Sequence, residues 1–382
     1  MRARVVLAAV AATALGGCSA AGSGTSVTVS GKTLTIYAAA PAAGAAAGTD
    51  VLDAERLAWS QKSSEVTAFR LRLGTLSAAK PSDNARTAIS DTTAIAYLGE
   101  VQPGTSVATV GITNAEQLLQ VSPTDTAQGL TDPHTPGLSN VPDRYLESQK
   151  TNGRTFARVV PNTGAESRAL AAELHTLGVR SLYIGSDGSD YAVALAAALR
   201  AAATGVNITS GPLDASRAGG AGAVFAATDS IPAARAFFTK VLARQPQAEL
   251  LGPSALADPS LASGLPASAR LYVSAPGFLA RSAPAPAAAL FTTQFRSAYG
   301  HVPSPQAIFG YEGMLAVLSV LKKAGTSANS RGFVVHAFLT LHRPDSVLGP
   351  YSINANGDTS IAPFVILRLH GGQLVPFAQQ QG

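Results

Sequence analysis

Cysteine and charge are both scarce in this chain. Cys18 is the only cysteine among 382 residues, so no disulfide can form within the chain. Charged residues make up 13% of the sequence and hydrophobic residues 46%, which leaves ample apolar side chains for a large core. At roughly 150 residues per domain, this length predicts two domains.

Several patterns that carry chemistry are also missing. The basic residues are scattered and form no stripe with interleaved aromatic residues, so we expect no nucleic-acid partner. The histidines are isolated from one another, and no segment has a metal-ligand spacing or resembles a cofactor-phosphate loop. Asp187–Asp190 lacks the further acidic ligands of a calcium loop, and no serine lies in a nucleophile-elbow context. The sequence therefore predicts a protein without metal or cofactor that is not an enzyme.

The amino terminus has the pattern of an export signal. Two arginines within the first four residues precede an apolar run from Val5 to Leu15, which is too short to span a bilayer. Two glycines then precede Cys18, and this segment resembles the lipobox of bacterial lipoproteins. The resemblance implies that residues 1–17 are removed and that lipid on Cys18 holds the protein at the extracytoplasmic face of the cell membrane. The alternative is an ordinary secretory signal that ends near residues 20–21, with Cys18 discarded.

The segment after Cys18 has a different composition. Residues 18–33 are rich in Ser, Gly, Thr and Ala, which predicts a flexible tether. No later apolar run reaches about 18 residues without a charge or a helix breaker, so we predict no transmembrane helix.

From residue 34 onward, predicted strands and helices alternate. Strands are predicted at residues 34–37, 66–73, 94–98, 179–184, 206–209, 223–227, 249–251 and 271–274. Helices are predicted at about residues 50–61, 83–91, 163–177, 191–203, 231–243, 287–299 and 306–321. In the third of these, Leu170, Leu174 and Leu177 recur at helical spacing after two candidate N-caps, Asn162 and Thr163. Ser230 is the candidate N-cap of the helix at about residues 231–243. The alternation predicts an α/β protein with mainly parallel sheets, and its restart after residue 150 predicts two Rossmann-like lobes.

Two segments depart from this alternation. Residues 132–153 are rich in proline, glycine and polar residues, and we interpret them as a long surface excursion rather than a third domain. Near the carboxyl end, the Asn356-Gly357 turn predicts a hairpin that joins residues 351–353 to residues 364–369.

Several short segments along the chain are informative through their order and spacing. They are Gly99–Val101, Gly104–Ser106, Leu118–Thr126, Phe156–Pro161, Ser181–Tyr191, Leu251–Pro253, Gly349–Tyr351 and Asn356–Asp358. Together they resemble the type I periplasmic binding proteins, most of all the branched-chain amino-acid and amide binding proteins of ABC importers. The resemblance implies two lobes joined by a three-strand hinge, with a ligand clamped between them. It also implies discontinuous lobes, the first formed by residues 34–152 with 281–340 and the second by residues 153–280 with 341–382.

The first lobe supplies most of the candidate ligand contacts. Thr105 and Ser106 precede a predicted helix at residues 107–112, where backbone N–H groups and hydroxyls suit a carboxylate or carbonyl. A simple N-cap by Ser106 is the alternative. Ser122, Thr124 and Thr126 follow a strand end and can donate to the same ligand group. Turn chemistry around the intervening proline is the alternative for these three.

Two further candidates come from the second lobe. Tyr191 begins a helix where the family often places a ligand-facing tyrosine, and a half-buried aromatic residue is the alternative. Ser254 follows a strand end where the amino-acid binding members carry an acidic partner for the ligand ammonium. Because Ser254 has no charge, we expect a neutral or anionic ligand, unless Asp125 or Asp187 reaches the cleft.

These observations predict an extracytoplasmic solute-binding lipoprotein of an ABC importer. Its expected partners are an ABC permease and a small polar organic ligand, which is amino-acid-like, an amide or a carboxylate. The alternative is a lipoprotein of the same fold that has no permease and that senses a ligand or assists envelope-building enzymes. Permease and ATPase genes beside its own gene would favour uptake.

Overall fold

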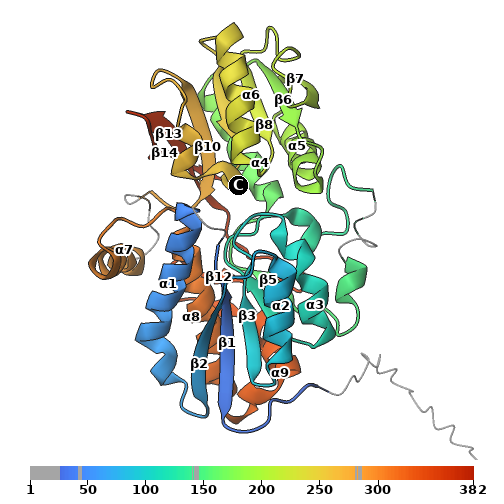
Figure 1. Cartoon of the computed structure of the whole chain (residues 1–382), viewed down its shortest axis with the longest axis vertical. Coiled ribbons are helices and arrows are strands. Elements are labelled where there is room, and N and C mark those ends of the chain that lie inside the picture. Colours follow the sequence, from blue (N-terminus) through green and yellow to red (C-terminus); the bar gives the residue numbers. More distant parts are fainter. Residues whose placement is uncertain (1–25, 42–44, 140, 142–145, 280–281, 283–285) are drawn as a thin grey trace, which may run out of the picture.

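The chain folds into two α/β lobes that are stacked along the long axis of the molecule (Figure 1). The computed structural model describes residues 26–41, 45–139, 141, 146–279, 282 and 286–382. The predicted signal peptide and Cys18 lie outside these residues. Within the described residues, no helix is both long enough and apolar enough to cross a membrane.

The first lobe is built on a parallel sheet with the strand order β2-β1-β3-β4-β5. Its strands are β1 (Thr33–Ala39), β2 (Arg70–Leu76), β3 (Ala94–Leu98), β4 (Leu119–Ser122) and β5 (Phe156–Arg158). Its helices are α1 (Ala46–Lys62), α2 (Pro81–Ser90), α3 (Val110–Ala115), α7 (Pro286–Tyr299), α8 (Ala307–Ala324) and α9 (Arg331–Leu339). β3 is buried along its whole length, as expected of a parallel strand covered on both faces. The apolar helix α8 lies against α1 in the main core of the lobe, and α2 covers the other sheet face around Tyr97.

The second lobe is built on a sheet with the order β14-β13-β10-β9-β8-β6-β7. Its strands are β6 (Ser181–Ser186), β7 (Asn207–Pro212), β8 (Ala223–Ala227), β9 (Glu249–Gly252), β10 (Arg270–Pro276), β13 (Pro363–His370) and β14 (Gln373–Gln381). Its helices are α4 (Thr163–Thr176), α5 (Asp190–Ala202) and α6 (Ile231–Arg244). The strands from β6 to β10 are parallel, and β13 and β14 are antiparallel additions. Side chains of α4 and α5 fill the core on one sheet face, and α6 covers the other.

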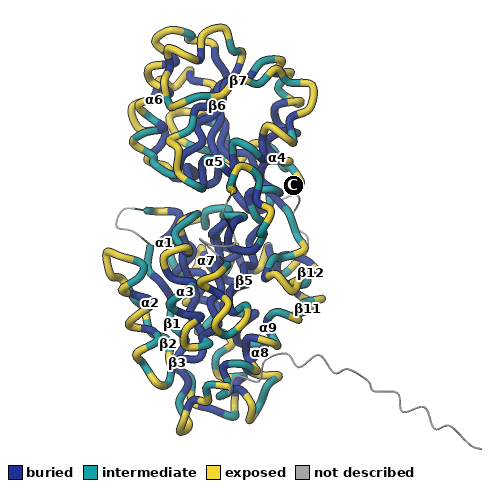
Figure 2. Tube along the Cα trace, turned by 90° about the vertical axis from the view of Figure 1, so that its right-hand side faces the viewer, coloured by how far each residue is buried: buried dark blue, intermediate teal, exposed yellow. Residues whose placement is uncertain are grey.

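The chain crosses between the lobes three times. The crossings join β5 to α4, β10 to α7, and the short strand β12 (Tyr351–Ser352) to β13. Figure 2 shows that buried residues fill the interior of each lobe on either side of this narrow junction. The predicted fold class, two Rossmann-like lobes with mainly parallel sheets, is confirmed.

The predicted carboxyl-terminal hairpin is wrong. β12 pairs with β11 (His342–Arg343), whereas β13 pairs with β10 and β14. The Asn356-Gly357 turn closes only a local loop, in which Asn354 N donates to Asp358 O at 2.9 Å. The real hairpin joins β13 to β14 through two glycines, Gly371 and Gly372, which both have positive φ. A turn signal marks a chain reversal, but it does not select the strands that pair.

Two predicted boundaries also differ from the packing. Residues 27–29 belong to the first lobe, because Val29 is buried in its core and Val29 N donates to Asn329 O at 2.8 Å. The predicted tether therefore does not extend to residue 33, because the first lobe already includes residues 27–29. Residues 347–353 were predicted in the second lobe, but Leu348 and Tyr351 pack in the core of the first. That lobe therefore extends past residue 340.

Candidate functional site

The loops after β3 and β4 form the edge of the first lobe that faces the second. Carboxyl ends of parallel strands are the usual place for a ligand in such sheets. Three hydroxyls at this edge are used inside the lobe, however. Ser122 Oγ donates to Glu100 O at 2.6 Å, and Thr124 Oγ1 donates to Val101 O at 2.5 Å. Ser106 Oγ accepts from Glu100 N at 3.2 Å. These side chains fasten the two loops to each other.

The loop at Thr105 and Ser106 is likewise occupied. It forms a short 3₁₀ helix over Thr105–Ala108, and α3 begins only at Val110, so the predicted helix at 107–112 and a Ser106 N-cap are both wrong. The Asp125 carboxylate accepts from Gly104 N at 2.7 Å and from Ser106 N at 2.8 Å. Thr105 Oγ1 donates to Gln102 O at 2.5 Å. The amides predicted to hold a ligand carboxylate are held by the chain's own carboxylate.

Thr126 differs from its neighbours at this edge. Its carbonyl oxygen accepts from both the backbone N–H and the hydroxyl of Thr163, at 2.7 and 2.8 Å. These bonds fix the Thr126 backbone against the first crossing between the lobes. The Thr126 hydroxyl is buried and has no well-formed hydrogen bond. The fold thus holds this polar atom in place, and its neighbour inside the protein is the Tyr191 hydroxyl.

Two hydroxyls of the second lobe lie beside it. Tyr191 lies in the first turn of α5, which begins after the N-cap Ser189, and Ser254 follows β9 after Pro253. The Tyr191 and Ser254 hydroxyls are also buried without a well-formed hydrogen bond. Burial raises the pKa of Tyr191 well above its ordinary value, and the nearby Thr126 and Ser254 hydroxyls act in the opposite direction. The fold thus brings together three of the predicted ligand residues, Thr126, Tyr191 and Ser254.

A carboxylate that the sequence analysis missed completes this group. Glu166 lies in the first turn of α4 and is 0% exposed. Its Oε1 accepts from Ser254 N at 2.5 Å and from Ser274 Oγ at 2.6 Å, whereas its Oε2 is buried without a partner. Burial raises the pKa of Glu166, against the effect of these hydrogen bonds. Its signal in the sequence is its position four residues before Leu170 and eight before Leu174, on the apolar face of the helix.

The acidic residue that related proteins carry at the position of Ser254 is absent, but Glu166 brings a carboxyl group to the site from another segment. The sequence pointed to Asp125 or Asp187 as a replacement. Asp125 is instead bound to backbone amides of its own lobe, and Asp187 Oδ2 accepts from Thr228 Oγ1 at 2.5 Å. Glu166, by contrast, acts on this group of hydroxyls, because its negative charge contributes to the raised pKa of Tyr191.

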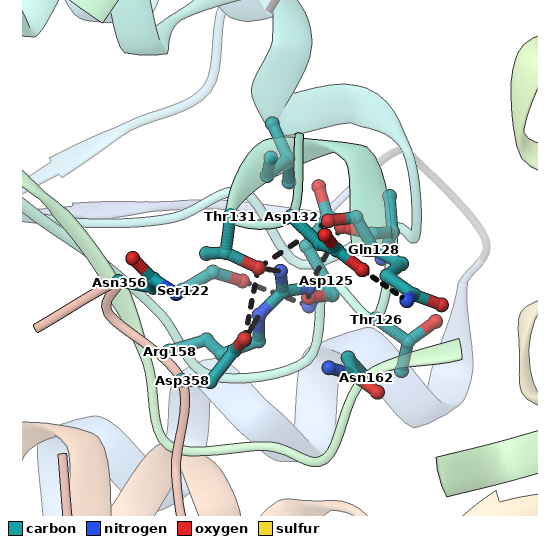
Figure 3. Close-up of polar contacts among 12 residues, drawn as sticks. Ser122, Asp125, Thr126, Gln128, Thr131, Asp132, Arg158, Asn162, Asn356 and Asp358 are labelled. Carbon is teal, nitrogen blue, oxygen red and sulfur yellow. Dashed lines mark hydrogen bonds and ion pairs between the residues drawn. The ribbon is translucent and has the colours of Figure 1, made fainter. Parts of the chain in front are cut away.

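A buried arginine positions the loop that carries Thr126 (Figure 3). Arg158, on β5, is 0% exposed, and its Nη1 donates to the carbonyl oxygens of Asp125 and Ala127 at 2.9 Å each. Its Nε donates to Asp358 Oδ1 at 2.8 Å, and its Nη2 donates to Thr131 Oγ1 at 2.6 Å. Asp358 belongs to the third crossing, so one side chain joins β5, the loop after β4 and that crossing.

The cavity beside Tyr191 is small. A cavity of about 10 Å³ lies next to Tyr191, Thr163 and Gln128, which holds at most about one water molecule. A methyl group at Gly104 of the first lobe would lie only 3.5 Å from Tyr191 Cβ of the second. A larger hollow of about 520 Å³ lies at the opposite, amino-terminal ends of β1 and β2, away from these groups. A ligand reaches the buried hydroxyls only when the lobes separate.

Metal binding finds no support in the geometry. Among the described residues, no three His, Cys, Asp or Glu side chains are arranged to hold a metal ion. The site consists of hydroxyls and one carboxylate, which are groups that recognise a polar organic molecule through hydrogen bonds.

Comparisons with known proteins agree with this architecture. A family model described as "Periplasmic binding protein" matches residues 79–373. The leucine-binding protein LivK of Thermotoga maritima has a similar structure, with 18% identity and a TM-score of 0.75 over 91% of this chain and 98% of that one. LivJ of Streptococcus pneumoniae, in complex with isoleucine, gives 16% identity and a TM-score of 0.72 over 92% and 99% of the two chains. A solute-binding protein of R. palustris in complex with benzoate gives 15% and 0.70 over 92% and 97%. No curated protein sequence matches.

Proposed function

The chain belongs to the periplasmic binding protein family, and from that premise we propose that it is an extracytoplasmic solute-binding protein of an ABC importer. It clamps a small polar organic molecule between its two lobes and presents the closed complex to a permease. The predicted resemblance to this family is confirmed; the ligand, the permease and the lipid anchor belong to the proposal.

One observation supports the proposal most strongly. Thr126 of the first lobe meets Tyr191 and Ser254 of the second, and all three hydroxyls are buried without a well-formed hydrogen bond. A buried polar group without a partner costs about 1–3 kcal/mol. A ligand that enters between separated lobes and bonds to hydroxyls of both removes this cost and holds the lobes around itself. Ligand binding therefore stabilises the closed arrangement of the two lobes.

The similar solved structures contain small organic ligands. They include complexes with isoleucine and with benzoate, so proteins of this fold hold both amino acids and aromatic acids. For this chain, two observations favour a ligand with an amine over the neutral or anionic ligand that the sequence predicted. Asp125 occupies the amides that would take a ligand carboxylate, and Glu166 supplies a charge that a ligand amine can use.

A ligand screen tests the binding role. Purified protein that begins at Ser26 is screened by thermal shift against amino acids, amides, amines, carboxylic acids and sugars. Each compound that stabilises it is then tested by small-angle scattering. We expect at least one compound to raise the melting temperature and to decrease the radius of gyration. Stabilisation without compaction would contradict the clamp.

A matched pair of variants locates the binding site. Tyr191→Phe removes one of the three hydroxyls, so we expect at least a tenfold loss of affinity for the compound found in the screen. Tyr272→Phe, at the far end of β10 in the same lobe, should bind as wild type does. Equal affinities of the two variants would place the ligand elsewhere.

The membrane attachment is tested separately. We propose that Cys18 carries the lipid, because two arginines and an apolar run precede it. Two acyl chains give stable anchoring where a single chain does not. Cys18→Ser should move the protein from the membrane fraction to the soluble fraction of cells. A variant that is processed normally and stays in the membrane fraction would contradict the lipoprotein assignment.

A further inference from the structure

The two edges that meet between the lobes carry acidic groups. Glu100 and Asp125 lie on the first-lobe edge, and Glu166, Asp187 and Asp229 lie on the second. Among the described residues, no lysine, arginine or histidine forms an ion pair with Glu100, Glu166, Asp187 or Asp229. The nearest buried guanidinium, that of Arg158, is bonded to Asp358, Thr131 and two carbonyl oxygens. The junction therefore holds several carboxyl groups that have no side-chain counter-ion.

The acidic groups differ in what they already bind. The two Asp125 oxygens accept three backbone N–H bonds in all, from Gly104, Ser106 and Ala127. Glu100 accepts from the Tyr97 hydroxyl. Glu166 is the exception at this junction, because Oε1 accepts two hydrogen bonds and the buried Oε2 has no well-formed bond, with the Ser254 hydroxyl as a neighbour of the carboxylate.

The surroundings of Glu166 Oε2 are hydroxyl groups. Tyr191, which feels the charge of Glu166, lies within reach of the Thr126 and Ser254 hydroxyls. All four residues are at least nine-tenths buried, and each has a polar atom without a well-formed partner. A carboxylate with hydroxyl acceptors around it matches an ammonium group, which has three N–H donors and no acceptor. An incoming carboxylate would meet like charge and no free backbone amide.

We propose that the ligand is a small organic cation whose ammonium group binds Glu166 Oε2 and the Tyr191, Ser254 and Thr126 hydroxyls. The inference rests on the proposed solute-binding function and names its ligand class. The ligand carries an amine and needs no carboxylate, because Asp125 fills the place in the first lobe where a carboxylate would be held. The remaining part of the molecule lies towards the acidic residues Asp187 and Asp229 at the carboxyl ends of β6 and β8.

The test compares ligands that share a carbon skeleton and differ in charge. Isothermal titration is performed with 3-methylbutylamine, L-leucine and 4-methylpentanoate, and with the pair benzylamine and benzoate. Agmatine and tyramine extend the amine series. We expect at least one amine to bind, and every carboxylate matched to it to bind at least tenfold more weakly. An anion that binds more tightly than its matched amine overturns the inference.

A variant of the carboxylate gives the second readout. Glu166→Gln keeps an oxygen for Ser254 N and Ser274 Oγ but removes the charge. We expect it to weaken amine binding at least tenfold while a neutral ligand of the same skeleton changes less than threefold. Glu173→Gln, in the same helix and also buried, is the matched control and should bind as wild type does. Unchanged amine affinity in Glu166→Gln overturns the inference, because Glu166 would then be only a protonated core residue.

The reciprocal variant tests the occupied amides. Asp125→Ala frees Gly104 N and Ser106 N, and we expect it to gain affinity for the amino acid that corresponds to the best amine. An Asp125→Ala protein with unchanged preference for the amine overturns the assignment of Asp125 as the internal substitute for a ligand carboxylate. If no compound of any charge binds with compaction, the proposed function itself fails. If neutral or anionic compounds bind in a Tyr191-dependent way, the function stands and the cation assignment fails.

Discussion

The facing edges of the two lobes are built from similar residues but use them differently. On the first lobe, the side chains of Ser122, Thr124 and Asp125 bond to the backbone of neighbouring loops. On the second, the hydroxyls of Tyr191 and Ser254 have no well-formed partner. The polar side chains of the first edge thus form hydrogen bonds within their own lobe, whereas the second edge has hydroxyls without a well-formed hydrogen bond.

This difference between the two edges predicts where substitutions will lower stability and where they will weaken ligand binding. Satisfied buried groups stabilise the fold, whereas unsatisfied ones lower its stability and are retained only where another molecule satisfies them. Substitutions at the first edge should therefore cost stability, and substitutions at the second should cost binding. Thr126 is the exception on the first lobe, since its backbone is fixed and its hydroxyl is free.

The largest effect is expected at Arg158. Arg158→Met keeps an apolar side chain of similar length but leaves Asp358 and two buried carbonyl oxygens without their donor. Loss of one partner of a buried ion pair costs about 3–5 kcal/mol, and we expect that decrease in the free energy of unfolding in urea. Arg86→Met, which breaks only an exposed pair with Asp83, should change it by less than about 1 kcal/mol. Similar values for the two variants would show that the Arg158 network does not hold the junction.

The next largest expected effect is the pH dependence that Glu100 gives to the free energy of unfolding. Burial raises the pKa of Glu100 from 4.5 to about 7, with the nearby Asp125 adding to the shift. The folded protein then holds this proton more tightly than the unfolded chain, so stability falls as pH rises from the ordinary value through the raised one. A difference of this size corresponds to on the order of 3 kcal/mol at pH 8.

The Glu100→Gln variant isolates this contribution. Glutamine keeps an acceptor for the Tyr97 hydroxyl without carrying charge. We expect urea unfolding to give similar stabilities for the two proteins at pH 5 and a progressively more stable variant between pH 5 and pH 8. A constant difference across this range would mean that Glu100 titrates normally.

Asp125 should have a smaller effect. Asp125→Ala leaves three backbone N–H groups without their acceptor, and we expect a loss of about 2–3 kcal/mol in the free energy of unfolding. Asp125→Asn keeps one acceptor oxygen and should lose less than half as much. A neutral Asp125→Ala would show that water replaces the carboxylate and that the first edge is not saturated as described.

The smallest effect has the opposite sign. Tyr191→Phe removes a buried hydroxyl that lacks a well-formed bond, so we expect the unliganded protein to be unchanged or about 1 kcal/mol more stable. Thermal unfolding without ligand measures this effect. A loss of more than about 1 kcal/mol would show that the hydroxyl is already satisfied within the protein, and the contrast between the two edges would disappear.

Much of the fold could be predicted from local patterns. Asn162 caps α4 and Ser230 caps α6 as their sequence positions predict, because a capping side chain bonds only to the helix that follows it. The burial of Leu170 and Leu174 likewise follows from helical spacing. Predictions that depended on partner choice were less accurate. The strand at residues 364–369 was predicted correctly, but its partners β10 and β14 were not, since a strand's own residues do not specify its neighbours.

The candidate site shows the same limit. Thr126, Tyr191 and Ser254 were predicted from family-like segments, and the fold brings them together. The same segments suggested Thr105, Ser106, Ser122 and Thr124, whose hydroxyls are bonded within the first lobe. Serine and threonine hydroxyls near strand ends occur in both groups. Only the neighbours around each hydroxyl separate a free one from a bonded one.

The sequence by itself determined the alternation of strands and helices, the two lobes and the residue types at the strand ends, because these follow from periodicities of a few residues. The tertiary structure alone decided which polar groups remain free. Glu166 reaches Ser254 and Ser274 across 88 and 108 residues of chain, and Arg158 reaches Asp358 across 200. A hydrogen bond depends on distances of about 3 Å, which are set only when distant segments pack together. The charge and the free donors of the site are therefore properties of the folded chain.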